Sequence, residues 1–200
     1  NFFQEWGRKN TFYLVSGSDM PKLKEQMAEL EGLALGIFTC CGNEFWADDV
    51  IQYQNTFTPP EDFKSYIVQT LSRNDYPVKA GGHIEDRGSM VNFSIVGRDC
   101  TLAERQDYFE YDKVEGEREA IATYINTNFP DLEAVIGGQI SIDIYPKGYD
   151  KSQILQHIKS KYNEYIFIGD RTMPGGNDYP LAALMKRTDN CSVYQVENFK

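Results

Sequence analysis

The periodicity of apolar residues separates the two ends of the chain from its middle. Near both ends, short apolar runs such as residues 11–16 and 165–168 are each followed by a turn or loop and then by helical spacing. Strands that alternate with helices in this way form parallel sheets covered by helices. In the middle, residues 91–96 and 139–145 alternate with a period of two, which is typical of sheet. The sequence therefore predicts an α/β chain, with a parallel-sheet core interrupted by an inserted α+β cap.

Turn and capping residues locate the boundaries of these elements. Capping-box patterns at 58–61 and 101–104 each predict the start of a helix. Residues 87–89 predict a hairpin turn, and residues 48–56 are interpreted as a connector. The resulting domain boundaries are residues 1–54 and 147–200 for the core and residues 55–146 for the cap.

The strand predicted over residues 139–145 has two different faces. Ile140, Ile142 and Ile144 point one way and are expected to enter the core. The opposite face is expected to be polar and open to a ligand, with a merely solvated strand face as the alternative. Its members are Gln139, Ser141, Asp143 and Tyr145.

Composition and charge exclude several classes of function. Aromatic residues make up 14% of the chain, which is too many for a mainly disordered protein. The apolar runs are far shorter than the roughly 20 residues of a transmembrane helix, and the net charge of -10 opposes a nucleic-acid backbone. We therefore expect neither a membrane nor a nucleic acid as partner. The four cysteines match neither a zinc pattern nor a disulfide framework, which indicates reduced thiols and a cytoplasmic location.

Two carboxylates flank a Gly- and Pro-rich loop near the end of the chain. Asp170 follows the predicted strand at 165–168, and Asp178 lies at the far end of the loop. Open α/β sheets bind ligands at the carboxyl ends of their strands, and carboxylate oxygens suit Mg²⁺. The tract predicts a magnesium site. A solvated turn in which an Asp caps a helix is the alternative.

Two other residues are candidate ligands for a phosphate. Ser16 lies in a polar turn between a predicted strand and a predicted helix, where hydroxyl and backbone N–H groups can hold an anion. Lys151 lies at the start of another predicted helix and could neutralise a phosphate. A serine-capped helix and an ordinary surface lysine explain the same residues without a ligand.

Three arginines gather in a short window of the predicted cap. Arg87, Arg98 and Arg105 lie within 19 residues of an otherwise acidic chain. A guanidinium group offers a planar fork of donors suited to bidentate contact with a phosphate. Ion pairs with the acidic residues nearby are the alternative.

Several tracts together resemble one family, the eukaryotic-type phosphomannomutases of the haloacid dehalogenase superfamily. The tracts are residues 138–151 and 169–178, the latter containing Thr-Met-Pro-Gly-Gly-Asn-Asp, together with the spacing Arg87-x10-Arg98-x6-Arg105. The similarity extends from about Thr11 to Val196. It implies a haloacid-dehalogenase-like core with an inserted cap, and interconversion of mannose 6-phosphate and mannose 1-phosphate through a hexose bisphosphate.

The resemblance also implies roles for the candidate residues. Mg²⁺ is the implied metal, hexose 1,6-bisphosphate the implied activator and a homodimer through the cap the implied assembly. The distal phosphate and the sugar would be bound by cap residues, namely Arg87, Arg98, Arg105, Ser141 and Asp143. Ser16 and Lys151 would hold the transferring phosphoryl group. Asp170 and Asp178 would ligate the metal.

One signature of the family is missing from this sequence. The family begins with a strand that ends in Asp-x-Asp-Gly-Thr, whose two Asp residues are the nucleophile and the general acid/base. No Asp-x-Asp occurs here. We therefore expect a sequence that is incomplete at its start and a 200-residue chain that is inactive by itself. A sugar-phosphate phosphatase on the same fold and an inert sugar-phosphate-binding module are the alternatives.

Overall fold

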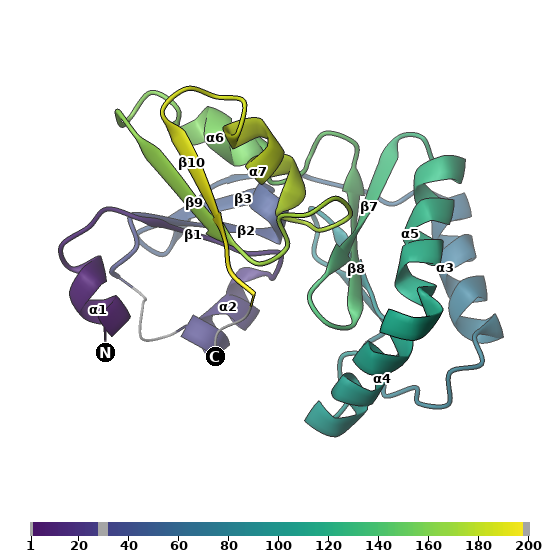
Figure 1. Cartoon of the computed structure of the whole chain (residues 1–200). Helices are drawn as coiled ribbons and strands as arrows, with labels where there is room; N and C mark the ends of the chain where they lie inside the picture. Colours follow the sequence, from purple (N-terminus) through teal and green to yellow (C-terminus); the bar gives the residue numbers. More distant parts are fainter. Residues whose placement is uncertain (1, 28–31, 198–200) are drawn as a thin grey trace. The chain divides into compact units, whose positions relative to one another are not determined.

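The computed structural model describes residues 2–27 and 32–197, which form two compact units (Figure 1). Unit 1 comprises residues 1–55, 149–172 and 180–200, and unit 2 comprises residues 56–148 and 173–179. The segment 173–179 thus belongs to unit 2, although the turn pattern placed it with the core segment 147–200. Leu30, which the helical spacing after the apolar run 11–16 places in a helix, lies outside the described residues.

Unit 1 is built on two sheets that share one apolar core. One sheet has the order β1-β2-β3-β4 and the other pairs β10 with β9. The β1–β2 and β9–β10 pairs are parallel, which confirms the predicted parallel-sheet core. The strands are β1 (Tyr13–Val15), β2 (Gly36–Thr39), β3 (Glu44–Ala47), β4 (Val50–Gln54), β9 (Tyr165–Gly169) and β10 (Cys191–Gln195).

The helices of unit 1 bury apolar side chains against both sheets. Phe38 of β2 and Phe167 of β9 belong to one buried cluster with residues of α6 and α7. The helices are α1 (Phe2–Gly7), α2 (Met20–Met27), the short 3-10 turn η2 (Cys40–Gly42), α6 (Gln153–Ile158) and α7 (Tyr179–Met185). Burial of this cluster holds β2 and β9 in one unit although they belong to different sheets.

The prediction of a connector at residues 48–56 was wrong for most of that segment. Strands β3 and β4 form an antiparallel hairpin there, with Ala47 opposite Val50. Asp48 and Asp49 have positive φ angles of 51° and 59°. Two such residues make the two-residue turn that matches the twist of a hairpin, and Asp tolerates this conformation better than most residues.

Unit 2 is an antiparallel sheet covered by helices. The strand order is β5-β6-β8-β7, and every neighbouring pair is antiparallel. Helices α3 and α5 run side by side (Figure 1), and the rings of Tyr66 and Tyr124 stack between them with centroids 4.6 Å apart. The elements are α3 (Glu61–Arg73), β5 (Ile84–Asp86), β6 (Val91–Phe93), α4 (Leu102–Glu115), α5 (Glu117–Asn128), β7 (Leu132–Gly137) and β8 (Ser141–Pro146).

The local signals in unit 2 were right in two places and wrong in one. The hairpin turn at 87–89 is confirmed, because Arg87 N donates to Met90 O at 2.9 Å between β5 and β6. The capping box of Thr101 and Glu104 is also confirmed at the start of α4. Helix α3 instead begins after Pro60 without a side-chain cap. The fixed φ of proline suits a helix start, so the Thr58 pattern was not needed there.

Replacing Thr101 by Ala should weaken helix α4, which carries Arg105. The Thr101 hydroxyl accepts from Glu104 N at 3.2 Å, and Thr101 N donates to the Glu104 carboxylate at 2.8 Å. Loss of an N-cap side chain costs about 1 kcal/mol. Urea unfolding should show that loss for Thr101→Ala. The control Thr127→Ala, which removes an exposed hydroxyl inside α5, should be close to wild type.

The same capping box predicts a pH dependence. Hydrogen bonds from the backbone and the side chain of Thr101 lower the pKa of Glu104. The ionised carboxylate therefore adds stability that is complete above the ordinary pKa of Glu and is lost as the pH falls through the lowered value. The stability difference between Thr101→Ala and wild type should shrink on acidification. A difference that stays constant between pH 7 and pH 3 would contradict this assignment.

Candidate functional site

The three arginines of the sequence prediction come together in unit 2. Arg98 has a pKa that burial lowers, and the neighbouring charges of Arg87 and Arg105 lower it further, while Glu85 and Asp143 oppose the shift. The charges of Arg87, Arg105, Glu85 and Asp143 thus all act on Arg98. The three arginines lie close enough to interact electrostatically within a chain of net charge -10.

Glu85 of strand β5 lies between two of these arginines. Its Oε2 accepts from Arg87 Nη2 at 2.6 Å, and its Oε1 lies 3.4 Å from Arg98 Nε. The Arg87 side chain is 4% exposed and the Glu85 side chain 35%, so only the arginine side of this pair is shielded from water. The ion pairs that the sequence left as an alternative are therefore present, and Glu85 contacts both Arg87 and Arg98.

Arg105, on helix α4, has a donor atom that forms no hydrogen bond within the described part of the chain. Its buried Nε has no hydrogen-bond partner among the described residues. A buried donor left without a partner costs free energy, commonly about 1–3 kcal/mol. An anion bound beside Arg98 and Arg105 would supply the missing acceptor.

A hydrogen-bonded network connects Arg98 to strand β8. Arg98 Nη1 donates to Ser141 Oγ at 3.0 Å. Asn92 of β6 donates through Nδ2 to Asp143 Oδ1 at 2.7 Å, and Asn177 Nδ2 donates to Asp143 Oδ2 at 3.2 Å. The predicted residues Ser141 and Asp143 are therefore neighbours of Arg98.

The expectation of an open polar face on this strand was wrong. Ser141 and Asp143 are 3% and 2% exposed, and Tyr145 is fully buried. The segment 173–179 lies against the sheet here: Ile136 N donates to Gly175 O at 3.1 Å, and Asn177 reaches Asp143. A contact between residues so far apart in the chain leaves no trace in the period-two pattern of the strand.

Three residues of this cluster were not singled out from the sequence as functional. Glu85, Asn92 and Asn177 have no distinctive spacing, and each gains its role from the groups it contacts. Asn177 lies within the Thr-Met-Pro-Gly-Gly-Asn-Asp tract that carries the resemblance, and this was the one signal that could have directed attention to it.

The candidate phosphate ligands of unit 1 lie at strand and helix ends. Ser16 follows β1, and its Oγ accepts from Ser18 N at 3.0 Å. Asp19 Oδ1 accepts from Lys22 N at 3.1 Å, so Asp19, and not Ser16, supplies the side-chain cap of α2. Lys151, just before α6, is 4% exposed. An ordinary surface lysine is therefore excluded for Lys151, because a buried ammonium group requires anionic or polar partners.

The two predicted metal ligands fall in different units. Asp170 is an exposed residue at the end of β9 in unit 1, and Asp178 is a buried residue of unit 2. Among residues 2–27 and 32–197, no group of three or more His, Cys, Asp or Glu side chains is arranged to hold a metal ion. Proteins commonly bind Mg²⁺ through one or two carboxylates together with water and substrate phosphate.

No helix in the described part of the chain is long and apolar enough to cross a membrane. None of the four cysteines forms a disulfide in the described part of the chain, and Cys40 and Cys41 are fully buried beside strand β2.

Comparison with solved structures defines the class of fold. The alignment with a HAD subclass IIB sugar phosphatase covers 95% of this chain and 76% of the phosphatase, with a TM-score of 0.55 and 13% identity. The alignment with the sucrose-phosphatase of Synechocystis covers 97% of this chain and 84% of that enzyme, with a TM-score of 0.50 and 13% identity. At such low identity the likeness shows the fold alone. The chain has the haloacid-dehalogenase-like α/β fold with an inserted α+β cap.

Sequence comparison then defines the family within that fold. The model of the family "Eukaryotic phosphomannomutase" matches residues 1–198. The phosphomannomutase of Encephalitozoon cuniculi is 40% identical over 185 residues, which cover 87% of this chain and 72% of the relative. That of Drosophila melanogaster is 33% identical over 202 residues, covering 90% and 76%. The chain belongs to the eukaryotic phosphomannomutase family.

Proposed function

We propose that this protein interconverts mannose 6-phosphate and mannose 1-phosphate through a hexose bisphosphate. The relatives named phosphomannomutase support this reaction. The single observation that carries it is the arginine cluster of unit 2, in which three guanidinium groups lie close together and the buried Nε of Arg105 has no hydrogen-bond partner among the described residues. A phosphate monoester meets both requirements, because it supplies negative charge and several acceptor oxygens.

Within this proposal, Arg87, Arg98 and Arg105 bind the phosphate that is not being transferred. A mutase needs such a site, because the bisphosphate must remain bound while it reorients to present its other phosphate. Ser141 and Asp143 hold sugar hydroxyls. Hydrogen bonds from Asn92 and Asn177 hold the Asp143 carboxylate in place.

The transferring phosphoryl group is proposed to lie in unit 1, near Ser16 and Lys151. Ser16 supplies a hydroxyl at the turn after β1, and buried Lys151 supplies a positive charge that would strengthen as negative charge develops on the phosphoryl oxygens. These two assignments rest on the family resemblance together with the burial of Lys151.

Enzymes of the haloacid dehalogenase superfamily generally use Mg²⁺. We propose Asp170 as a metal ligand of this protein, with Asp178 as a further ligand or a hydrogen-bond partner of one. The remaining ligands would be groups that the described side chains do not supply, such as water and substrate phosphate. Hexose 1,6-bisphosphate as activator, a homodimer formed through the cap and a cytoplasmic location complete the proposal.

The proposal is tested on the natural protein purified from its complete coding sequence. Mannose 1-phosphate is supplied with Mg²⁺, with and without a catalytic amount of hexose 1,6-bisphosphate. Formation of mannose 6-phosphate that depends on the bisphosphate is the expected result. Release of mannose and inorganic phosphate instead would contradict the mutase and indicate a phosphatase. Sedimentation of the same sample tests the homodimer.

A further inference from the structure

A buried ion pair joins the two long helices of unit 2. Asp112 lies near the end of α4 and Arg118 near the start of α5, on either side of Gly116, which adopts the left-handed conformation with φ 65°. Arg118 donates to the two oxygens of Asp112 through its backbone N and its Nε, each at 2.7 Å. Arg118 is 4% exposed and Asp112 is 8% exposed. The pair therefore fixes the Arg118 guanidinium in one orientation.

The other end of that guanidinium reaches the turn between β7 and β8. Arg118 Nη1 lies 3.2 Å from Gly138 O and 3.4 Å from Ser141 O. These carbonyls belong to the residues that begin and end the turn. The planar guanidinium of Arg118 thus contacts the Asp112 carboxylate and two carbonyls of the turn at once. Lysine cannot reproduce this geometry.

The turn between β7 and β8 also helps to position the Arg98 guanidinium in the proposed phosphate site. Ser141 Oγ accepts from Arg98 Nη1 at 3.0 Å. Ser141 therefore contacts Arg118 through its backbone carbonyl and Arg98 through its hydroxyl. Arg98 also contacts Glu85 on its other side, at 3.4 Å. Its guanidinium is therefore held between β5 and β8, and a displaced turn would release one of these two contacts.

We infer that Arg118, held by Asp112, is a positioning residue that orients Arg98 for phosphate binding through Ser141. Arg118 does not touch the substrate in this arrangement. The inference rests on the proposed function, because it assigns a role to Arg98 as a phosphate ligand. Misplacement of a binding group by a fraction of an ångström is enough to weaken a charge-assisted hydrogen bond, because such bonds are short and directional.

The test is the affinity of the 200-residue chain for mannose 6-phosphate, measured by titration calorimetry. Arg118→Lys keeps the positive charge beside Asp112 but loses the fork that reaches Gly138 and Ser141. We expect affinity to fall about tenfold, the scale of one weakened hydrogen bond to a charged group. The control is Tyr108→Phe, which removes a partly buried hydrogen bond to Glu117 at the same helix junction and should leave affinity unchanged.

A double variant separates positioning from a general loss of structure. In Ser141→Ala the hydroxyl that joins the turn to Arg98 is gone, so adding Arg118→Lys should lower affinity by less than threefold more. The same tenfold loss in both backgrounds would overturn the inference, as would unchanged affinity in Arg118→Lys. If Arg118→Lys does not fold, Asp112→Asn replaces it, because it keeps the side-chain shape and removes only the charge that orients Arg118.

The two proposals fail in different ways. A wild-type chain that binds mannose 6-phosphate no better than unphosphorylated mannose contradicts the proposed phosphate site, and the inference falls with it. If the wild-type chain binds mannose 6-phosphate and both Arg118→Lys and Asp112→Asn bind it with the same affinity, only the positioning role is contradicted.

Discussion

Replacement of Arg98 by Met should lower the affinity for mannose 6-phosphate by at least about 100-fold, as two hydrogen bonds to a charged group, each worth about 1.5 kcal/mol or more, are lost. Arg98 is the centre of the cluster, since it contacts Ser141 and Glu85 and lies within the fields of Arg87 and Arg105. Methionine keeps most of the apolar length of the side chain, so the fold should persist. Calorimetric titration at one fixed salt concentration measures the change.

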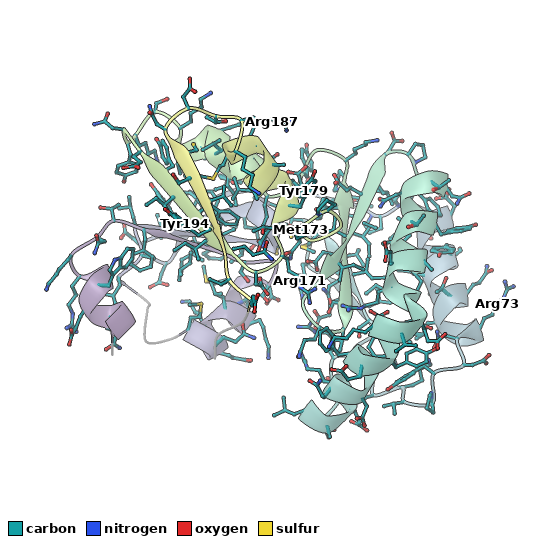
Figure 2. The ribbon with its side chains drawn as sticks, in the orientation of Figure 1. Arg73, Arg171, Met173, Tyr179, Arg187 and Tyr194 are labelled. Carbon is teal, nitrogen blue, oxygen red and sulfur yellow. The ribbon has the colours of Figure 1, made fainter. Side chains whose placement is uncertain are left out.

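The matched control for this variant is Arg73→Met. Arg73 is an exposed residue at the end of α3, and Figure 2 shows it pointing outward from that helix. The control removes the same charge from the same unit, so any effect of net charge alone appears in both variants. If Arg98→Met binds mannose 6-phosphate within threefold of Arg73→Met, the arginine cluster is not the phosphate site.

Replacement of Gly97 by Ala should destabilise unit 2 by at least about 3 kcal/mol, because it combines left-handed strain with a steric overlap. Gly97 has φ 88°, and a Cβ there would lie 2.1 Å from Gly81 O and 3.0 Å from Gly81 C. The obstacle is backbone, and the next residue is tied to it, because Arg98 N donates to Gly81 O at 2.8 Å. The free energy of unfolding in urea gives the measurement.

Gly116→Ala is the control for the steric part of that cost. Gly116 also has a positive φ of 65°, but among the described residues no atom lies within 4 Å of a Cβ added there. It should lose only about 1 kcal/mol, the strain of the left-handed conformation. Equal losses for the two variants would show that the segment around Gly81 moves aside. Because Gly97 precedes Arg98, the folded fraction of Gly97→Ala should also bind mannose 6-phosphate less tightly.

Local sequence signals were sufficient for the elements whose geometry depends on nearby residues. The hairpin turn at Arg87 and the capping box at Thr101 follow from contacts within a few residues, and both are confirmed. The parallel pairs of unit 1 follow from buried apolar runs that alternate with helical spacing. The prediction of a connector at 48–56 failed because Asp is common in loops as well as in hairpin turns. Asp48 and Asp49 therefore did not reveal that the residues on either side of them pair as β3 and β4.

The arginine cluster could be predicted from residue type and spacing, but the residues that contact it could not. Arg87, Arg98 and Arg105 lie close in sequence, and the resemblance to phosphomannomutases assigned them a common role that their shared electrostatic environment supports. Glu85, Asn92 and Asn177 are ordinary polar residues in the sequence. Only their contacts with Arg87, Arg98 and Asp143 distinguish them.

The sequence by itself determined the family, the class of fold and the residues that carry positive charge into the cap, because motif spacing and periodicity are properties of short stretches of chain. Tertiary structure alone decided that strand β8 is covered on its polar face by segment 173–179, that Lys151 is buried, and that Asp112 and Arg118 support the turn beneath Ser141. Each of these depends on groups brought together from separate elements, and burial and hydrogen bonding between such groups are set by packing, which no local pattern encodes.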